Sequence, residues 1–154
     1  MTTVSSPPIN PLVFGNFVSL ARDSARMKGG RRKLEVTINR QYLATLWQSQ
    51  GGCCAYTNQP MILPSIHKAG NEKGRRFRYA PEDNELMKAS LDRIDSSKGY
   101  VPGNVHFVCR AVNYLKSTAS HEQVVELLAM LCSGFSVDKV MLPPAPEPAA
   151  VLPV

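Results

Sequence analysis

The chain has 154 residues, of which 44% are hydrophobic and 19% are charged, and its formal net charge is +6. These values are ordinary for one globular domain with appendages. No stretch approaches the roughly 18 consecutive apolar residues of a membrane-spanning helix, and the first residues, MTTVSSPPINPLVFG, lack the basic and apolar regions of a secretory signal. We therefore expect an intracellular, cytoplasmic protein with no membrane partner, and the positive charge favours a polyanionic partner.

The N-terminal third of the chain predicts two helices. Residues 1–9 are polar and contain proline, so we expect them to be disordered. Asn10 and Pro11 suit a helix start, and apolar residues then recur at helical spacing until Gly29 and Gly30. Asn39 is positioned to cap a second helix that ends before Gly51. Residues 10–50 thus form a basic N-terminal helical region.

The central part predicts a small strand–turn–strand–helix unit. Residues 62–88 form a long polar segment, expected to be a mobile loop or ribbon. Residues 89–95 have strand character, residues 96–103 have turn chemistry, and residues 105–109 (VHFVC) predict a second strand. A short helix is expected over residues 111–116. The predicted fold class is therefore α+β, with flanking N- and C-terminal helices.

The C-terminal part predicts one more helix and then an irregular tail. Ser120 and Gln123 form a capping-box pattern ahead of apolar residues at helical spacing. Residues 51–142 are expected to form the core together with this helix. The tail, residues 143–154, is rich in proline, cannot join a regular element and is expected to be disordered.

The strand–turn–strand–helix unit places polar residues where they could converge. Asp92 lies near the end of the first strand and Asn113 on the following helix. Mg²⁺ prefers oxygen ligands, often takes only one or two from the protein, and leaves the other positions for water and a phosphate oxygen. Such an ion can stabilise the leaving oxygen in phosphodiester cleavage. Lys116 lies three residues after Asn113, on the same side of the helix, where it could meet a phosphate.

The segments SLDRIDSSKGYVPGNV, VCRAVN and YLK resemble the HNH (His-Me finger) endonucleases, in the phage-type branch written S-x-D-R-I-D-x-x-x-G-Y-x-x-x-N-V-x-x-V-x-x-x-x-N-x-x-K. Upstream, QSQGGCCAYTNQP resembles the segment that precedes the finger in that branch. The resemblance covers about residues 14–130. It implies a ββα-metal finger, cleavage of DNA phosphodiester bonds with a divalent metal, Mg²⁺ or Mn²⁺, and an origin in a phage or mobile element.

The resemblance also implies roles for individual residues. Asp92 and Asn113 would be the metal ligands. Asn104 would tie the turn together by hydrogen bonds. Asp95 would either contact the metal ligands without binding the metal itself, or accept a hydrogen bond from Arg93.

One position departs from the family pattern. The family has histidine as general base where this chain has Arg93, and an arginine side chain stays protonated and cannot accept a proton. Three outcomes are open: the metal or another group activates water while Arg93 neutralises the phosphate, a histidine such as His106 or His67 substitutes as base, or the site binds DNA without cutting it. His121 is the weakest of the histidine candidates.

A structural zinc site is not expected. Many fingers of this kind hold zinc with two C-x-x-C pairs. Here the pairs have become Cys54 with Thr57 and Cys109 with Val112, and two thiols do not complete a tetrahedron. We expect Cys54 and Cys109 to be small buried packing residues, and all four cysteines to be reduced.

Basic residues gather in two segments that flank the candidate site, and such residues supply most non-specific affinity for nucleic acid through phosphate contacts. The candidate nucleic-acid contacts are Arg31, Arg32, Lys33, Arg75, Arg76, Arg78 and Lys116. The expected partner is DNA, with RNA as an alternative. A catalytically inactive nucleic-acid-binding module is the second reading of the chain. A protein that binds partners through its proline-rich tail is the third.

Overall fold

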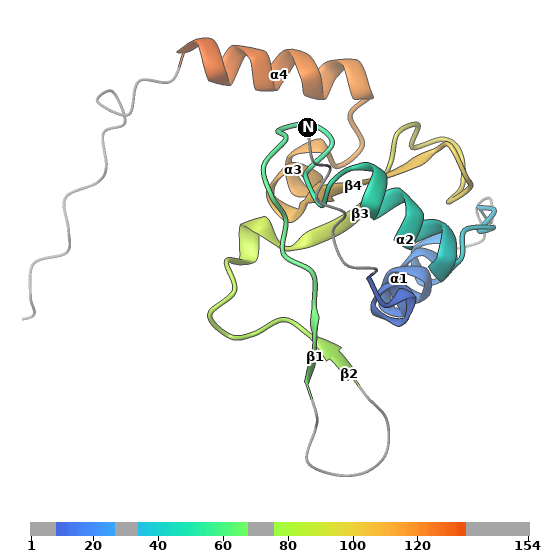
Figure 1. Cartoon of the computed structure of the whole chain (residues 1–154). Helices are drawn as coiled ribbons and strands as arrows, with labels where there is room; N and C mark the ends of the chain where they lie inside the picture. Colours follow the sequence, from blue (N-terminus) through green and yellow to red (C-terminus); the bar gives the residue numbers. More distant parts are fainter. Residues whose placement is uncertain (1–8, 27–33, 68–75, 135–154) are drawn as a thin grey trace, which may run out of the picture.

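The computed structural model describes residues 9–26, 34–67 and 76–134. For residues 66–67, 76–78 and 134, it describes the backbone alone. The described elements run in the order η1 (Pro11–Phe14), α1 (Gly15–Ala25), α2 (Arg40–Ser49), β1 (Ser65–His67), β2 (Arg76–Arg78), η2 (Glu85–Met87), β3 (Ala89–Arg93), β4 (Val105–Cys109), α3 (Arg110–Lys116) and α4 (His121–Gly134). The expected α+β class is confirmed (Figure 1).

The finger predicted from the sequence is formed by β3, β4 and α3. The two strands are antiparallel, with Asp92 opposite His106 and Leu91 opposite Phe107. β4 has the predicted bounds, β3 is two residues shorter than predicted, and α3 starts one residue earlier than predicted. Because successive strand residues point to opposite faces, the hairpin turns Asp92 and His106 to one face and Leu91 and Phe107 to the other.

The N-terminal helices pack against the apolar face of the hairpin. Phe107 is fully buried, and its ring centroid lies 5.6 Å from that of Phe14, 5.4 Å from that of Phe17 and 5.1 Å from that of Trp47. Each such aromatic contact contributes about 0.5–1.5 kcal/mol beyond the area that it buries. This cluster fixes the hairpin against η1, α1 and α2. The polar face of the hairpin, with Asp92 and His106, therefore points away from these helices.

Side-chain caps start the helices as the sequence predicts. The Asn10 side chain accepts a hydrogen bond from the Leu12 amide at 3.0 Å, and that of Asn39 accepts one from the Tyr42 amide at 2.9 Å. Each cap satisfies an amide that the first helical turn leaves without an intrahelical partner. The first helix ends at Ala25, before the predicted glycines. Gly29 and Gly30, like most of the predicted N-terminal disorder, lie outside the described residues.

Strands β1 and β2 form an antiparallel two-stranded ribbon, within the segment predicted to be a loop or ribbon. The ribbon projects from the side of the molecule away from α4 (Figure 1). Of the expected nucleic-acid contacts, Arg75 lies outside the described residues, and Arg76 and Arg78 are described by their backbone alone.

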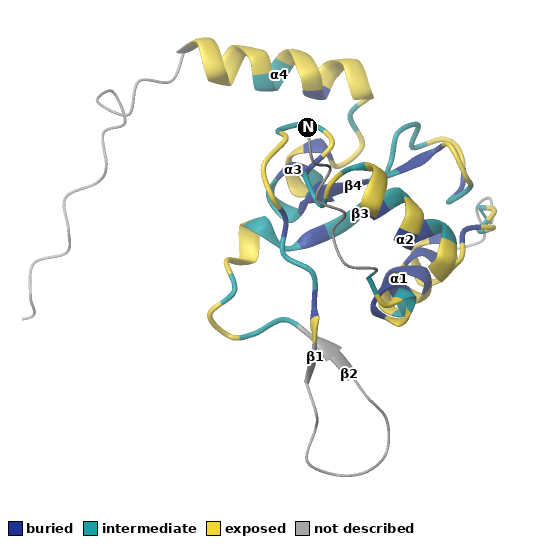
Figure 2. Cartoon of the chain, in the orientation of Figure 1, coloured by how far each residue is buried: buried dark blue, intermediate teal, exposed yellow. Residues whose placement is uncertain are grey.

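Helix α4 begins with the predicted capping box. The Gln123 side chain accepts a hydrogen bond from the Ser120 amide at 2.8 Å, and the Ser120 hydroxyl accepts one from the Gln123 amide at 3.3 Å. Val124 is buried in the core, whereas Met130 and Leu131 are exposed (Figure 2). Helix α4 therefore docks through its first turns. None of the helices in the described part of the chain has the length and apolar character needed to cross a membrane.

Candidate functional site

The polar face of the hairpin carries a pair formed by the buried Asp92 and the half-buried His106. The two residues are direct cross-strand partners, and His106 Nε2 lies 2.9 Å from Asp92 Oδ2. When Nε2 donates its proton to the carboxylate, the lone pair of the neutral ring lies on Nδ1. The pair therefore fixes both the tautomer and the direction of the imidazole, as a carboxylate does for a catalytic base.

Lys116 completes this cluster from α3. Its side chain is fully buried, and Nζ lies 3.0 Å from Asp92 Oδ1 and 2.5 Å from the Arg93 carbonyl oxygen. The sequence predicts that Lys116 meets a phosphate, but the structure places its ammonium inside the finger. The physical reason is the neighbouring carboxylate, because a buried charge is strongly unfavourable unless a partner compensates it.

Asp92 is ionised in this environment. Burial opposes its ionisation, but the hydrogen bonds from His106 and Lys116 outweigh this effect, so the pKa of the Asp92 carboxyl lies below its usual value. A buried, ionised carboxylate with two specific partners makes Asp92 a candidate functional residue, although structural ion pairs shift pKa values in the same way.

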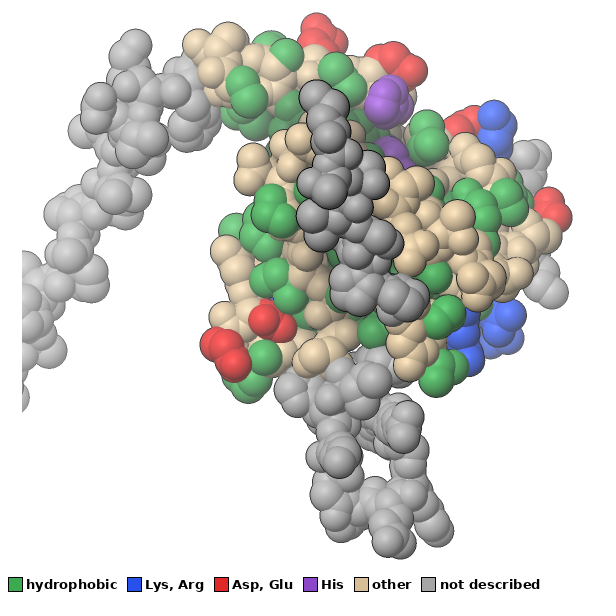
Figure 3. Space-filling view, in the orientation of Figure 1, with side chains coloured by type: hydrophobic (Ala, Val, Ile, Leu, Met, Phe, Trp, Pro, Cys, Tyr) green, Lys and Arg blue, Asp and Glu red, His purple; other side chains and the backbone are tan. Residues whose placement is uncertain are grey.

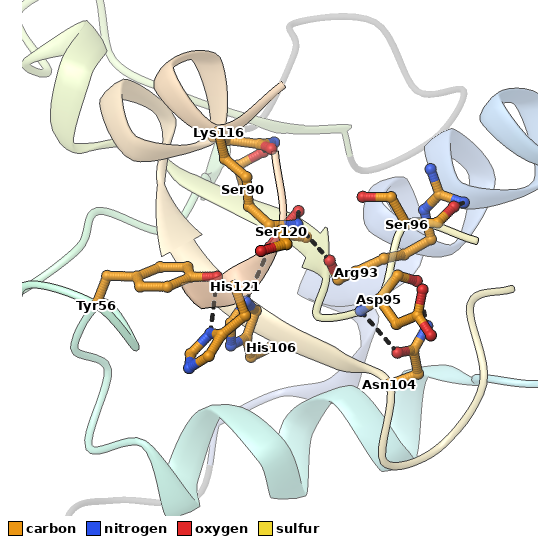
Figure 4. Close-up of polar contacts among 12 residues, drawn as sticks. Tyr56, Ser90, Arg93, Asp95, Ser96, Asn104, His106, Lys116, Ser120 and His121 are labelled. Atoms are coloured by element: carbon orange, nitrogen blue, oxygen red, sulfur yellow. Dashed lines mark hydrogen bonds and ion pairs between the residues drawn. The ribbon is translucent and has the colours of Figure 1, made fainter. Parts of the chain in front are cut away.

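Arg93 holds the loop that follows β3. Its Nη1 donates hydrogen bonds to the carbonyl oxygens of Ser96 at 2.8 Å and Lys98 at 3.0 Å, and its guanidinium lies 5.2 Å from the Tyr100 ring centroid. As the residue next to Asp92 in the strand, it points to the opposite face of the hairpin. Its side chain is thus engaged with the loop and lies away from His106 (Figure 4).

Asn104 ties the two ends of the same loop together. Its Oδ1 accepts a hydrogen bond from the Asp95 amide at 3.0 Å, and its Nδ2 donates to the carbonyl oxygens of Asp95 and Gly99. The Asp95 carboxylate accepts from the hydroxyl and amide of Ser97 and pairs with Lys98. The hydrogen bonds from Ser97 and Lys98 lower the pKa of Asp95 to about 2. The hydrogen bonds of Asp95 thus stay within the loop, and Arg93 is not its partner.

Asn113, the second expected metal ligand, has another partner. Its Nδ2 donates a hydrogen bond to Ser90 Oγ at 2.6 Å. Asp92 has both carboxylate oxygens engaged, so the expected Asp92–Asn113 ligand pair is not assembled. Within the described residues, no group of three or more His, Cys, Asp or Glu side chains could hold a metal ion. In this arrangement, an ion at Asp92 would have to displace Lys116 or His106 from one oxygen.

Tyr56 lies beside the pair and was not among the candidates from the sequence, because it comes from a distant segment. The Tyr56 ring meets the His106 ring edge-on, at a centroid distance of 5.1 Å. Its hydroxyl lies 3.1 Å from Nδ1 of His121, the first residue of α4 (Figure 4). Burial first, and then the negative charges of Asp92 and Glu122, raise the pKa of Tyr56 to about 12. No local sequence signal predicts a contact between residues 65 positions apart.

The remaining predicted residues divide into two groups. Arg31, Arg32 and Lys33 lie outside the described residues. Cys54 and Cys109 are both buried, as predicted. Burial is the largest cause that raises the pKa of the Cys109 thiol, and the neighbouring Cys54 adds to it.

Comparisons with known proteins add a structural likeness to this description. No protein-family model matches the chain, and no curated protein matches it. A similar solved structure is that of PacI, described as a rare-cutting HNH restriction endonuclease. The match has a TM-score of 0.47 and 20% sequence identity, and it covers 88% of this chain and 89% of that one. At this level the likeness concerns the path of the chain and supports no conclusion about activity.

Proposed function

We propose that the chain is an endonuclease of the HNH type that nicks or cuts DNA by hydrolysing phosphodiester bonds. The observation that supports this most is the Asp92–His106 pair on the polar face of a ββα finger, at 2.9 Å. A histidine held by a carboxylate can take a proton from water near neutral pH. His106 would thus replace the family histidine whose position Arg93 occupies.

The contacts within the cluster support a separate role for each residue. His106 accepts the proton of the attacking water through Nδ1. Asp92 holds the ring and stabilises the imidazolium that forms. Lys116 neutralises Asp92 from the side opposite His106 and so keeps the carboxylate ionised. Arg93 and Asn104 hold the loop in place.

A divalent ion, Mg²⁺ or Mn²⁺, belongs to the proposal through the resemblance of the finger motif. When bound, such an ion polarises the phosphoryl group and stabilises the leaving oxygen. Because the described donors do not assemble the expected ligand pair, no role of His106, Asp92 or Lys116 depends on the ion. The experiment below measures how the nicking rate depends on the divalent metal.

DNA binding without cleavage is the second candidate. One observation favours it: the Lys116 ammonium already occupies Asp92 Oδ1, on the carboxylate expected to bind a metal. In a binding module, this ion pair would be a structural element and His106 would be a spectator.

Nicking of supercoiled plasmid in Mg²⁺, Mn²⁺ or EDTA separates the two functions. We expect the wild type to nick DNA, and His106→Gln to lose about 10²–10⁴-fold in rate, the usual contribution of a general base. Asp92→Asn should lose activity similarly, whereas Asp23→Asn, at an exposed site on α1, should keep it. Asn113→Ala tests the expected second ligand. Binding of DNA without nicking in any metal would establish the second function.

A further inference from the structure

We propose that His121 is the general acid of the cleavage reaction and that Tyr56 positions it. This inference rests on the proposed endonuclease function and assigns the second proton transfer of the same site. Hydrolysis requires two proton transfers, because the attacking water loses a proton and the departing sugar oxygen gains one. The Asp92–His106 pair accounts for the first of these only.

His121 is placed to make the second transfer. Tyr56 contacts both imidazoles: its ring meets His106 at a centroid distance of 5.1 Å and His121 at 5.2 Å. The two histidines therefore flank one phenol, on β4 and at the start of α4. Figure 3 shows histidine side chains (purple) at the surface where α4 meets the finger. A phosphodiester bound beside Tyr56 would lie near both imidazoles.

The hydrogen bond to Tyr56 orients the acid. His121 Nδ1 lies 3.1 Å from the Tyr56 hydroxyl. In the imidazolium form that a general acid requires, Nδ1–H donates to that hydroxyl and the Nε2 proton is the one given away. The raised pKa of Tyr56, about 12, keeps the phenol neutral at physiological pH and leaves the histidine as the proton donor. Tyr56 acts through His121 and is a positioning residue.

His121 can also be reached by a substrate. It is exposed, and it lines an open hollow of about 480 Å³ between the loop after β3 and the first turn of α4, together with Ser96, Ser97 and Ser120. The hollow is also lined by Ile94, Asp95 and Glu122. Its serine hydroxyls suit contacts with sugar and phosphate oxygens.

The proposed step balances as follows. The water oxygen forms a bond to phosphorus and gives its proton to His106 Nδ1. The bond from phosphorus to the leaving sugar oxygen breaks, and that oxygen takes a proton from Nε2 of the His121 imidazolium, which becomes a neutral imidazole. The hydroxyl of the water thus ends on the phosphate, and the leaving sugar oxygen gains one proton. Proton exchange with solvent then restores both histidines.

A substrate with sulfur in place of the leaving oxygen tests this assignment. A thiolate leaves without needing a proton, so loss of the general acid should slow the oxygen substrate alone. We expect His121→Gln to cut an ordinary oligonucleotide duplex about 10²–10⁴-fold more slowly than the wild type. On the duplex with a bridging phosphorothiolate at the leaving position, the variant should stay within a few-fold of the wild type.

Two further variants serve as controls. His106→Gln should slow cleavage of both substrates equally, because the base is needed whichever atom leaves. Tyr56→Phe keeps the ring against His106 but loses one hydrogen bond to His121. It should slow the oxygen substrate by up to about tenfold, the value of a hydrogen bond of 0.5–1.5 kcal/mol, and leave the sulfur substrate unchanged.

The other outcomes overturn the assignment in distinguishable ways. If the wild type cuts and His121→Gln is equally slow on both substrates, His121 binds or supports the site and is not the acid. If that variant cuts both at the wild-type rate, His121 has no part in the reaction. If the wild type cuts neither substrate although it binds DNA, the proposed function itself fails and the inference fails with it.

Discussion

At the scale of single residues, Asp92 determines the character of the finger. The residue is only 7% exposed, and each carboxylate oxygen has one partner, a histidine from the neighbouring strand and a lysine from α3. Transfer of a lone carboxylate into a protein interior is strongly unfavourable, and two well-placed partners offset that cost. The same arrangement that keeps the charge tolerable also directs the imidazole, so stability and chemistry depend on one cluster.

Replacement of Lys116 by methionine tests this at the residue scale. The change keeps the length of the side chain but leaves Asp92 without its cation, so we expect a loss of about 3–5 kcal/mol in the free energy of unfolding. Urea denaturation measures it. Asp92→Asn combined with Lys116→Met should lose less than the sum of the single changes, because the remaining amide needs no counter-charge.

Lys98→Met is the matched control. Lys98 pairs with Asp95 at 3.2 Å, but its side chain is 67% exposed, and such surface pairs contribute about 0–1 kcal/mol. Equal stability losses for Lys98→Met and Lys116→Met would show that the buried ion pair has no special weight.

At the scale of elements, the sequence predicts well what local patterns determine. The helix caps at Asn10 and Asn39 and the strand at residues 105–109 follow from short-range chemistry, and the structure has all of them. The contacts of Lys116 with Asp92 and of Asn113 with Ser90 could not be predicted, because they depend on how α3 lies on the hairpin. The contact of Tyr56 with His121 depends in turn on how α4 returns to the finger. The local pattern of apolar and polar residues does not determine any of these long-range contacts.

The loop between β3 and β4 is a second element that long-range contacts define. Tyr100, in this loop, forms a β-bridge with Val36, and the Tyr100 amide donates a hydrogen bond to the Glu35 carbonyl oxygen at 2.8 Å. The Asn104 side chain donates another to the Gly99 carbonyl oxygen. The loop is thus fastened both to itself and to the segment before α2. This fastening holds Arg93 and its neighbours away from the polar face.

Replacement of Gly99 by alanine tests the fastening. A Cβ at this position would lie 2.2 Å from the Glu35 carbonyl oxygen, so the loop or the segment at Glu35 must move. We expect a loss of about 1–3 kcal/mol in the free energy of unfolding, typical of overpacking, measured by urea denaturation. Gly103→Asn is the control: that residue has a φ of +83° and open space around it, and asparagine tolerates such a backbone better than other residues. A loss from Gly99→Ala no larger than that of the control would contradict the close approach.

At the scale of the whole molecule, a small finger is held by N-terminal helices that also carry charge. The net charge of +6 is spread over a chain whose finger interior uses Lys116 for its own ion pair and Arg93 for its own loop. Contacts with a polyanion must therefore come from other basic residues. Among the described ones, Arg22 and Arg40 border a surface hollow of about 450 Å³ between α1 and α2, and Figure 3 shows basic side chains beside these helices.

The affinity for DNA should consequently depend steeply on salt and in part on these two arginines. Each phosphate contact releases counterions, so the logarithm of the binding constant falls with the logarithm of salt concentration by about 0.9 per contact. Fluorescence anisotropy of a labelled duplex between 50 and 200 mM NaCl, concentrations in the range where this effect is large, measures the slope. The double variant Arg22→Gln, Arg40→Gln should reduce the magnitude of this slope by the contribution of about two phosphate contacts. The double variant Arg22→Lys, Arg40→Lys should leave the slope unchanged, because the charge remains. A slope that is the same in both double variants would place the phosphate contacts elsewhere on the chain, and binding insensitive to salt would contradict DNA recognition through charge.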